Sequence, residues 1–178
     1  MPKRLIVLAI TVIAMAAAIG FIAMRPDQMT AEENSRKPVA EAGVTVGKTL
    51  PGFSLAGLDG KQVKVAPGGA AIVLNFWANW CPPCREEMPE LEKFFRKYTG
   101  KVQFYAINIQ EPTDKITEFM TKNQYTLTTL TDKDGEVAKN FRINAIPTSI
   151  VVDQQGVIRF RKSGPVTLAE LEGVLHGL

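Results

Sequence analysis

The chain has 178 residues, of which 46% are hydrophobic, with 21 Lys and Arg, 18 Asp and Glu, one His and two Cys. That length suits one ordinary domain plus an additional segment. Lys3, Arg4 and Arg25 account for the positive excess, because the rest of the chain holds 18 positive and 18 negative residues, so the net charge does not indicate nucleic-acid binding. Two Cys exclude a disulfide-stapled scaffold, and with one His they cannot form a four-ligand zinc site without carboxylates.

Residues 1–25 predict an N-terminal transmembrane signal-anchor. In the stretch 5–24 only Thr11 and Gly20 fall outside the hydrophobic set, and a helix of that length spans roughly 30 Å, the thickness of a bilayer core. Basic residues precede the stretch, so we expect a single pass through the cytoplasmic membrane, with the N-terminus in the cytoplasm and the remaining chain on the extracytoplasmic (periplasmic) side. A cleaved signal peptide is the alternative, because small residues at 14–18 suit a cleavage site.

Residues 26–43 are polar and show no apolar period, so they predict a flexible linker. The segment 44–178 is long enough for one compact domain, and short strand candidates alternate along it with amphipathic helices. The expected strands are 53–55, 61–65, 71–77, 102–109, 126–130, 148–152 and 157–161, and the expected helices run from the cysteines to Gly100 and over 113–122, 136–141 and 168–175. This order predicts an α/β fold with a mixed central sheet, an N-terminal β-hairpin and helices on both faces.

The two cysteines stand where the buried strand meets the next helix, in the sequence Trp80-Cys81-Pro82-Pro83-Cys84. Two Cys separated by two residues at such a junction are typical of a dithiol-disulfide site. A helix N-terminus offers free N–H groups and a partial positive charge, which favour the thiolate. We expect Cys81, at the exposed entrance, to attack, and Cys84, one turn into the helix on its apolar face, to resolve the mixed disulfide. A structural disulfide, a metal half-site and two incidental buried cysteines are the alternatives.

Several motifs carry a family resemblance. Three resemble thioredoxin, namely FWANWCPPC at 76–84, Met88-Pro89 in the following helix and Ile146-Pro147-Thr148 before a late strand. Three more narrow the resemblance to the membrane-tethered TlpA/ResA/DsbE-like branch, namely GKTLPGFSL at 47–55, the Leu58-Asp59-Gly60 turn and CREEMPELE at 84–92. The resemblance covers roughly residues 46–175 and implies a thioredoxin fold with an extra N-terminal hairpin and an inserted helix and strand at about 112–131.

The resemblance also implies an activity and partners. The chain would be a thiol-disulfide oxidoreductase with no cofactor beyond its own redox-active Cys81–Cys84 disulfide. It would accept electrons from a membrane donor of the DsbD/CcdA type and reduce oxidised extracytoplasmic client proteins. In some members of this branch the clients are the Cys-x-x-Cys-His segments of apocytochrome c.

The resemblance implies that Pro147 is in the cis form, which would place the Ile146 backbone beside the dithiol, where an extended client chain can pair with it. Trp80 abuts the first cysteine, and we expect it to form an apolar contact surface for clients together with Pro82 and Pro83. Trp77 continues the buried strand and is expected in the core.

Glu87 is a candidate proton acceptor for Cys84. It lies three residues further along the helix, in phase with the apolar face, and burial raises the pKa of a carboxyl toward neutral pH. ResA-like members keep a Glu at the matching place. Thioredoxin has a buried Asp where this chain has Asn75, which cannot titrate. The alternative is a first-turn Glu that only favours the helix dipole.

The direction of electron flow depends on how strongly the Cys81 thiolate is stabilised. Pro82 and Pro83 have no N–H, so two possible donors to the Cys81 sulfur are missing, which favours a reductant. A disulfide oxidase is an alternative. A second alternative is a copper-handling module of thioredoxin-like fold, although such chaperones use a wider cysteine spacing with an added His or Met ligand.

Overall fold

The computed structural model describes residues 41–178. The predicted signal-anchor at 1–25 and most of the predicted linker at 26–43 lie outside the described residues. The described chain is hydrogen-bonded from its first residue onward. The Thr49 N–H donates to the Glu41 carbonyl, and the Gly43 N–H donates to the Thr49 carbonyl. Among the helices in 41–178, none is both long enough and apolar enough to cross a membrane.

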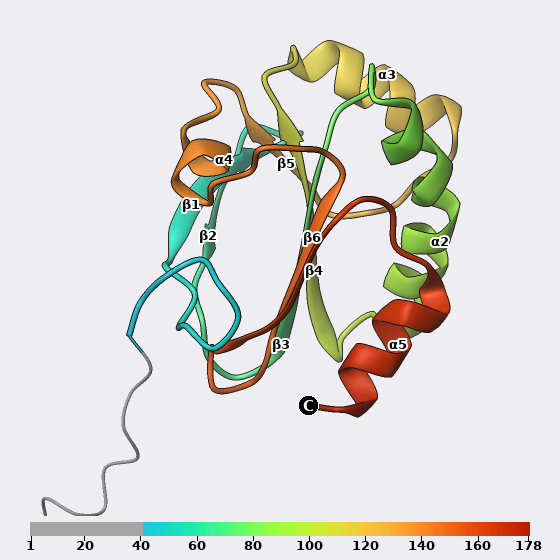
Figure 1. The fold of residues 1–178 in the computed structure, drawn as a ribbon. Helices are drawn as coiled ribbons and strands as arrows, with labels where there is room; N and C mark the ends of the chain where they lie inside the picture. The colour runs from blue at the N-terminus through green and yellow to red at the C-terminus, as the bar shows by residue number, and fades with distance from the viewer. Residues whose placement is uncertain (1–40) are drawn as a thin grey trace, which may run out of the picture. The chain divides into compact units, whose positions relative to one another are not determined.

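One seven-stranded mixed sheet forms the centre of the described chain (Figure 1). Its strands are β1 (Phe53–Gly57), β2 (Gln62–Val65), β3 (Ala71–Trp77), β4 (Val102–Ile109), β5 (Thr129–Asp132), β6 (Thr148–Val152) and β7 (Ile158–Ser163). The helices are α2 (Pro82–Tyr98), α3 (Thr113–Lys122), α4 (Glu136–Asn140) and α5 (Leu168–His176). The strand order is β2-β1-β5-β4-β3-β6-β7, in which β3, β4 and β5 run parallel and β6 runs antiparallel to β3. This is the predicted thioredoxin fold with its N-terminal hairpin and inserted helix and strand.

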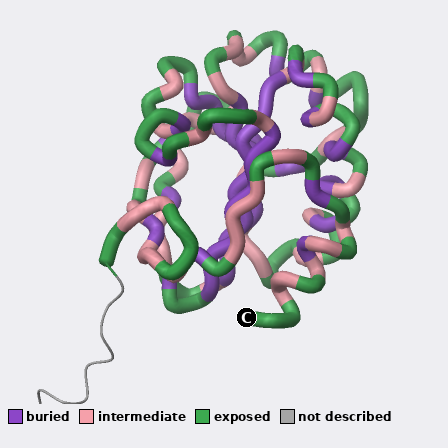
Figure 2. Tube along the Cα trace, in the orientation of Figure 1, coloured by how far each residue is buried: buried purple, intermediate pink, exposed green. Residues whose placement is uncertain are grey.

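Two hydrophobic clusters lie on opposite faces of the sheet, because successive side chains of β3 point to opposite sides. Val73 and Trp77 belong to the cluster under α2, α3 and α5, whereas Ile72, Leu74 and Phe76 belong to the cluster under α4. In Figure 2 the buried residues run along the central strands, while the helices around them carry both buried and exposed residues. The predicted burial of Trp77 is confirmed, and both cysteines lie in the first cluster.

The predicted bounds of four strands, β1, β2, β5 and β7, differ from the observed ones by one to three residues at one or both ends. Two of these differences have a clear cause. β1 runs two residues past the predicted end at 55, because Ala56 and Gly57 pair with β5. β5 begins at Thr129 and not at Thr126, because the Thr126 N–H and hydroxyl bond to the Glu92 carboxylate.

Candidate active site

The two cysteines form a disulfide at the N-terminus of α2, with their Cα atoms 5.3 Å apart. Cys81 is the N-cap residue, in extended backbone conformation, and its sulfur accepts the Cys84 N–H at 3.3 Å. Pro82 and Pro83 occupy the first two helical positions. The N–H groups at these positions make no hydrogen bond within a helix, so proline is tolerated there. The strand β3 ends four residues before Cys81, so the sheet core anchors this junction.

The expectation that Cys81 is exposed is wrong for the disulfide form. Its exposed fraction is 3%, against 0% for Cys84, because the loop before β6 covers it. The Ile146 carbonyl oxygen lies 3.7 Å from the Cys81 sulfur. Trp80 is the exposed neighbour, with 67% of its surface in solvent.

The loop that covers Cys81 is held at its end by hydrogen bonds. The Ile146–Pro147 bond is cis, as the resemblance implied. The Thr148 hydroxyl donates to the Ala145 carbonyl at 2.7 Å, and the Gly164 N–H donates to the Pro147 carbonyl at 2.7 Å. These bonds tie the loop to β6 and to the end of β7, so the Ile146 backbone has a defined position beside the disulfide.

Glu87 lies one turn beyond Cys84 and is buried, with 3% of its surface exposed. Its Oε1 accepts the Asn75 side-chain N–H at 2.8 Å, and its Oε2 accepts the backbone N–H of Val166 at 2.8 Å. Burial raises the pKa of Glu87 to about 7, although these two hydrogen bonds and the charge of Lys162 act in the opposite direction. A carboxyl that titrates near neutral pH, in a helix position facing the same side as Cys84, can exchange a proton under working conditions.

The Asn75 amide connects this carboxyl to β6. Its Nδ2 also donates to the Ser149 hydroxyl at 3.1 Å, while its buried Oδ1 has no hydrogen-bond partner within the described part of the chain. Rotation of the amide would present the oxygen to a protonated Glu87, so the group can serve either protonation state. The sequence pointed to Asn75 and Glu87 but gave no signal for Ser149 or Val166, which are distant in the chain.

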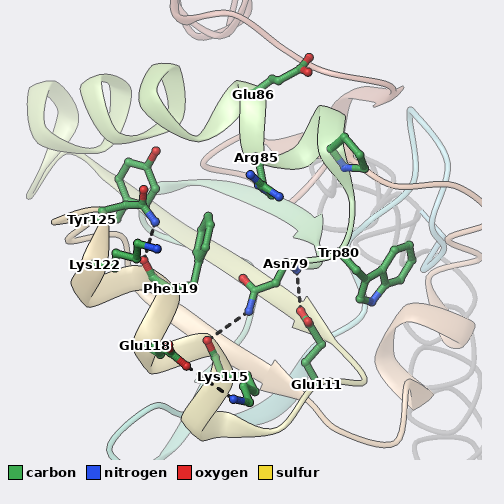
Figure 3. Close-up of a pocket in the computed structure, with 12 residues that line it drawn as sticks. Asn79, Trp80, Arg85, Glu86, Glu111, Lys115, Glu118, Phe119, Lys122 and Tyr125 are labelled. Atoms are coloured by element: carbon green, nitrogen blue, oxygen red, sulfur yellow. Dashed lines mark hydrogen bonds and ion pairs between the residues drawn. The ribbon is translucent and has the colours of Figure 1, made fainter.

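A hollow of about 900 Å³ lies on one side of Trp80, between α2 and α3, and Figure 3 shows the side chains that line it. Glu111 stands at its base, where its Oε2 accepts the Asn79 backbone N–H and the Asn108 side-chain N–H, both at 2.7 Å. The Asn79 amide in turn donates to the Lys115 carbonyl at 3.2 Å. No sequence signal pointed to Glu111, which joins the loop that leads into Cys81 to the end of β4.

A second hollow of about 880 Å³ lies on the other side of Trp80. It is lined by the end of β4, by α4 and by the loop that leads to Ile146. Its charged lining residues are Lys139 and Arg142, neither of which the sequence analysis singled out. Within residues 41–178, no three His, Cys, Asp or Glu side chains are grouped closely enough to hold a metal ion.

A thioredoxin fold with a Cys-x-x-Cys disulfide at a helix N-terminus and a cis-proline beside it defines a thiol-disulfide oxidoreductase. The sequence model of the AhpC/TSA family matches residues 46–161, and the chain belongs to this family.

Known relatives agree with this class. The chain is 33% identical to the thioredoxin-like protein YneN of Bacillus subtilis, over 74% of this chain and 79% of that protein. It is 29% identical to the thiol-disulfide oxidoreductase ResA of Bacillus thuringiensis subsp. konkukian, over 97% of this chain and 95% of the relative. Among solved structures, it is similar to a putative thiol:disulfide interchange protein DsbE from Chlorobium tepidum, with a TM-score of 0.69 and 27% identity, over 76% of this chain and 98% of that one.

Proposed function

We propose that this oxidoreductase is an extracytoplasmic reductase of protein disulfides, tethered to the cytoplasmic membrane by residues 1–25. The observation that carries the direction of electron flow is the hydrogen bonding of the Cys81 sulfur. Among the described residues, the Cys84 N–H is the one group that donates to it. A weakly stabilised thiolate makes the dithiol the better electron donor.

The two prolines explain why the Cys81 sulfur has so few donors. The first N–H groups of a helix point out of its N-terminus and stabilise an anion there. Pro82 and Pro83 occupy two of those positions and have no N–H to offer. We therefore expect a reduction potential nearer to the roughly −270 mV of thioredoxin than to the roughly −120 mV of DsbA.

Reduction of a client proceeds in two exchanges. The Cys81 thiolate attacks one sulfur of the client disulfide, forms a mixed disulfide and releases the other client sulfur as a thiolate, which takes up a proton. The Cys84 thiolate then attacks the Cys81 sulfur, releases the second client thiol and closes the Cys81–Cys84 disulfide. Two electrons and two protons pass to the client, and a membrane dithiol donor of the DsbD/CcdA type returns the pair to its reduced form.

Glu87 serves the second exchange as the proton acceptor for Cys84. A thiol must lose its proton before it attacks, and Cys84 is fully buried, where water cannot accept that proton. Glu87 faces the same side of α2, is itself buried and titrates at about 7, so it can take up the proton at neutral pH.

The client is held by the surface around the disulfide. Trp80 offers an exposed apolar face, with Pro82 beside it, and the Ile146 backbone lies next to the Cys81 sulfur. An extended segment that pairs with Ile146 would bring its own disulfide to Cys81. Apocytochrome c segments with a Cys-x-x-Cys-His sequence are short, extended and accessible before haem attachment, and they are the client class that we propose.

The reduction potential of the Cys81–Cys84 pair tests the direction. The full-length chain would be equilibrated in defined glutathione or dithiothreitol buffers and followed by Trp80 fluorescence, with a Trp77→Phe variant to isolate that signal. A value below about −220 mV supports a reductase, and a value above about −150 mV, close to DsbA, overturns it in favour of an oxidase.

A further inference from the structure

Arg142 ends α4 in a backbone conformation that suits glycine. Its φ is +52°, in the left-handed region, and it follows directly after Phe141, the last residue capping that helix. The Arg142 N–H bonds to the Lys139 carbonyl, and the Ile143 N–H bonds to the Ala138 carbonyl, each at 2.9 Å. Glycine is the usual residue at such a helix end, because a Cβ is disfavoured there. This chain has an arginine at a backbone position that favours glycine.

A second arginine holds this turn in place. Arg161 of β7 donates from Nη2 to the carbonyls of Phe141 and Arg142, at 2.9 and 3.0 Å, and from Nη1 to the Val44 carbonyl at 3.2 Å. Three carbonyls on two separate segments therefore fix the start of the loop that leads to Ile146. Arg142 projects from a backbone that is held in position.

Arg142 lines two hollows, a smaller one of about 530 Å³ beside Val44 and Phe53 and the one that it shares with Trp80. The latter differs in charge from the hollow between α2 and α3, which Trp80 also lines. The hollow between α2 and α3 is lined by three acidic and three basic residues. The second hollow, which we call the cationic hollow, is lined by two basic residues and no acidic ones, with Ile109, Ile143 and Ile146 as its larger aliphatic side chains.

The two cations of this hollow are not equivalent. Lys139 has an exposed carboxylate partner on its own helix, with its Nζ 3.3 Å from a Glu136 oxygen. Within residues 41–178, the Arg142 guanidinium makes no hydrogen bond or ion pair. Arg142 is therefore the cation of the hollow that is available to another molecule.

We propose that the cationic hollow binds the client segment beside its disulfide and selects segments that carry an acidic side chain there. The inference rests on the proposed reduction of client disulfides. The hollow includes Trp80 and Ile146, so a chain paired with Ile146 next to Cys81 runs directly into it. Its aliphatic side chains contact the apolar part of the segment, and Arg142 pairs with the carboxylate.

Three synthetic disulfide peptides test this selection. They are identical except for one residue next to the disulfide, which is Glu, Gln or Lys. Their reduction by the reduced full-length chain is followed through kcat/KM at low and at high ionic strength. We expect the Glu peptide to react about two- to fivefold faster than the Gln peptide, through a lower KM, and the advantage to shrink in high salt.

Two variants of Arg142 separate recognition from folding. Arg142→Gly suits the left-handed backbone, so it is expected to fold at least as well and to lose the preference for the Glu peptide over the Gln peptide. Arg142→Glu is expected to favour the Lys peptide. Lys64→Glu is the matched charge control, because Lys64 is an exposed cation on β2 that lines neither hollow. Gln124→Gly is the backbone control, because Gln124 also has a positive φ.

The outcomes distinguish the two proposals. Reduction of all three peptides with no charge preference, or a preference that both Arg142 variants retain, overturns selection by the cationic hollow. Failure to reduce even the Gln peptide overturns the proposed reductase itself. A preference that the Lys64 control shifts as much as the Arg142 variants would show a general charge effect and also overturns the assignment to this hollow.

Discussion

Two buried glutamates on α2 occupy similar positions but very different electrostatic environments. Glu87, near the disulfide, accepts hydrogen bonds from an uncharged amide and a backbone N–H, and no salt bridge among residues 41–178 includes it. Glu92, five residues further on, accepts the Arg96 Nε at 2.6 Å and two hydrogen bonds from Thr126. Their exposed fractions are 3% and 8%. Burial alone therefore does not distinguish a reactive carboxyl from a structural one.

The pKa values of the two groups follow from these partners. Burial raises the pKa of Glu87 to about 7, and the neutral donors only partly offset it. At Glu92 burial also acts to raise the pKa, but the bonds from Thr126 and Arg96 outweigh it and hold the pKa below its ordinary value of 4.5. The end of α2 next to the disulfide holds a carboxyl that can change protonation state, and the middle of the helix holds one that stays charged and anchors the inserted segment.

The largest expected effect is a pH-dependent loss of stability caused by Glu87. The pKa of Glu87 is higher in the fold than its ordinary value of 4.5. Its favourable contribution to the free energy of unfolding is therefore complete below pH 4.5 and is lost as the pH rises through about 7. The loss amounts to about 3 kcal/mol of the free energy of unfolding. Urea unfolding of the disulfide form from pH 4 to 8, compared with Glu87→Gln, isolates the effect. Parallel curves for the two proteins would contradict it.

The second-largest expected effect is on the rate of thiol-disulfide exchange. Glu87→Gln removes the proton acceptor that we propose for Cys84 and is expected to slow release of the client from the mixed disulfide about a hundredfold at neutral pH, the lower end of what a positioned base contributes. Rapid-mixing kinetics of that step over a pH series provide the measurement, and Glu92→Gln is the control that should leave the profile unchanged. An unchanged rate across pH in Glu87→Gln would remove Glu87 from the mechanism.

Sequence reasoning reached Glu87 because its phase on α2 and its distance from Cys84 depend only on helix periodicity. The hairpin, the strand-to-helix junction and the cis-proline were likewise predictable, from local patterns or from the family resemblance. Val166 and Ser149 were not, because their contacts with the Glu87 network join segments far apart in the chain. The start of β5 was misplaced for the same reason, since the Glu92 bond to Thr126 has no local signal.

The third prediction concerns Glu92. Glu92→Gln keeps the size of the side chain but removes the negative charge to which Arg96 and Thr126 donate their hydrogen bonds. We expect the free energy of unfolding to fall by about 2 kcal/mol at neutral pH. Because the pKa of Glu92 is lowered in the fold, its contribution is present above pH 4.5 and is lost as the pH falls below that value. The destabilisation measured by urea unfolding should therefore shrink in acid, opposite in sign to the Glu87 effect. An equal loss at pH 3 and pH 7 would contradict this assignment.

The smallest effect tests whether the Glu92 contact serves only the structure. Thr126→Val preserves the branched shape of the side chain and removes the hydroxyl that donates to Glu92 Oε1 at 2.6 Å, while the backbone N–H bond to Oε2 at 2.8 Å remains. One hydrogen bond to a charged acceptor is lost, so we expect the free energy of unfolding to fall by about 1 kcal/mol. Because the inserted segment stays attached through the backbone bond, the reduction potential and the exchange rate should match those of the wild-type chain. A slower exchange at unchanged potential would instead mean that the position of the inserted segment, and with it the hollow between α2 and α3, contributes to client binding.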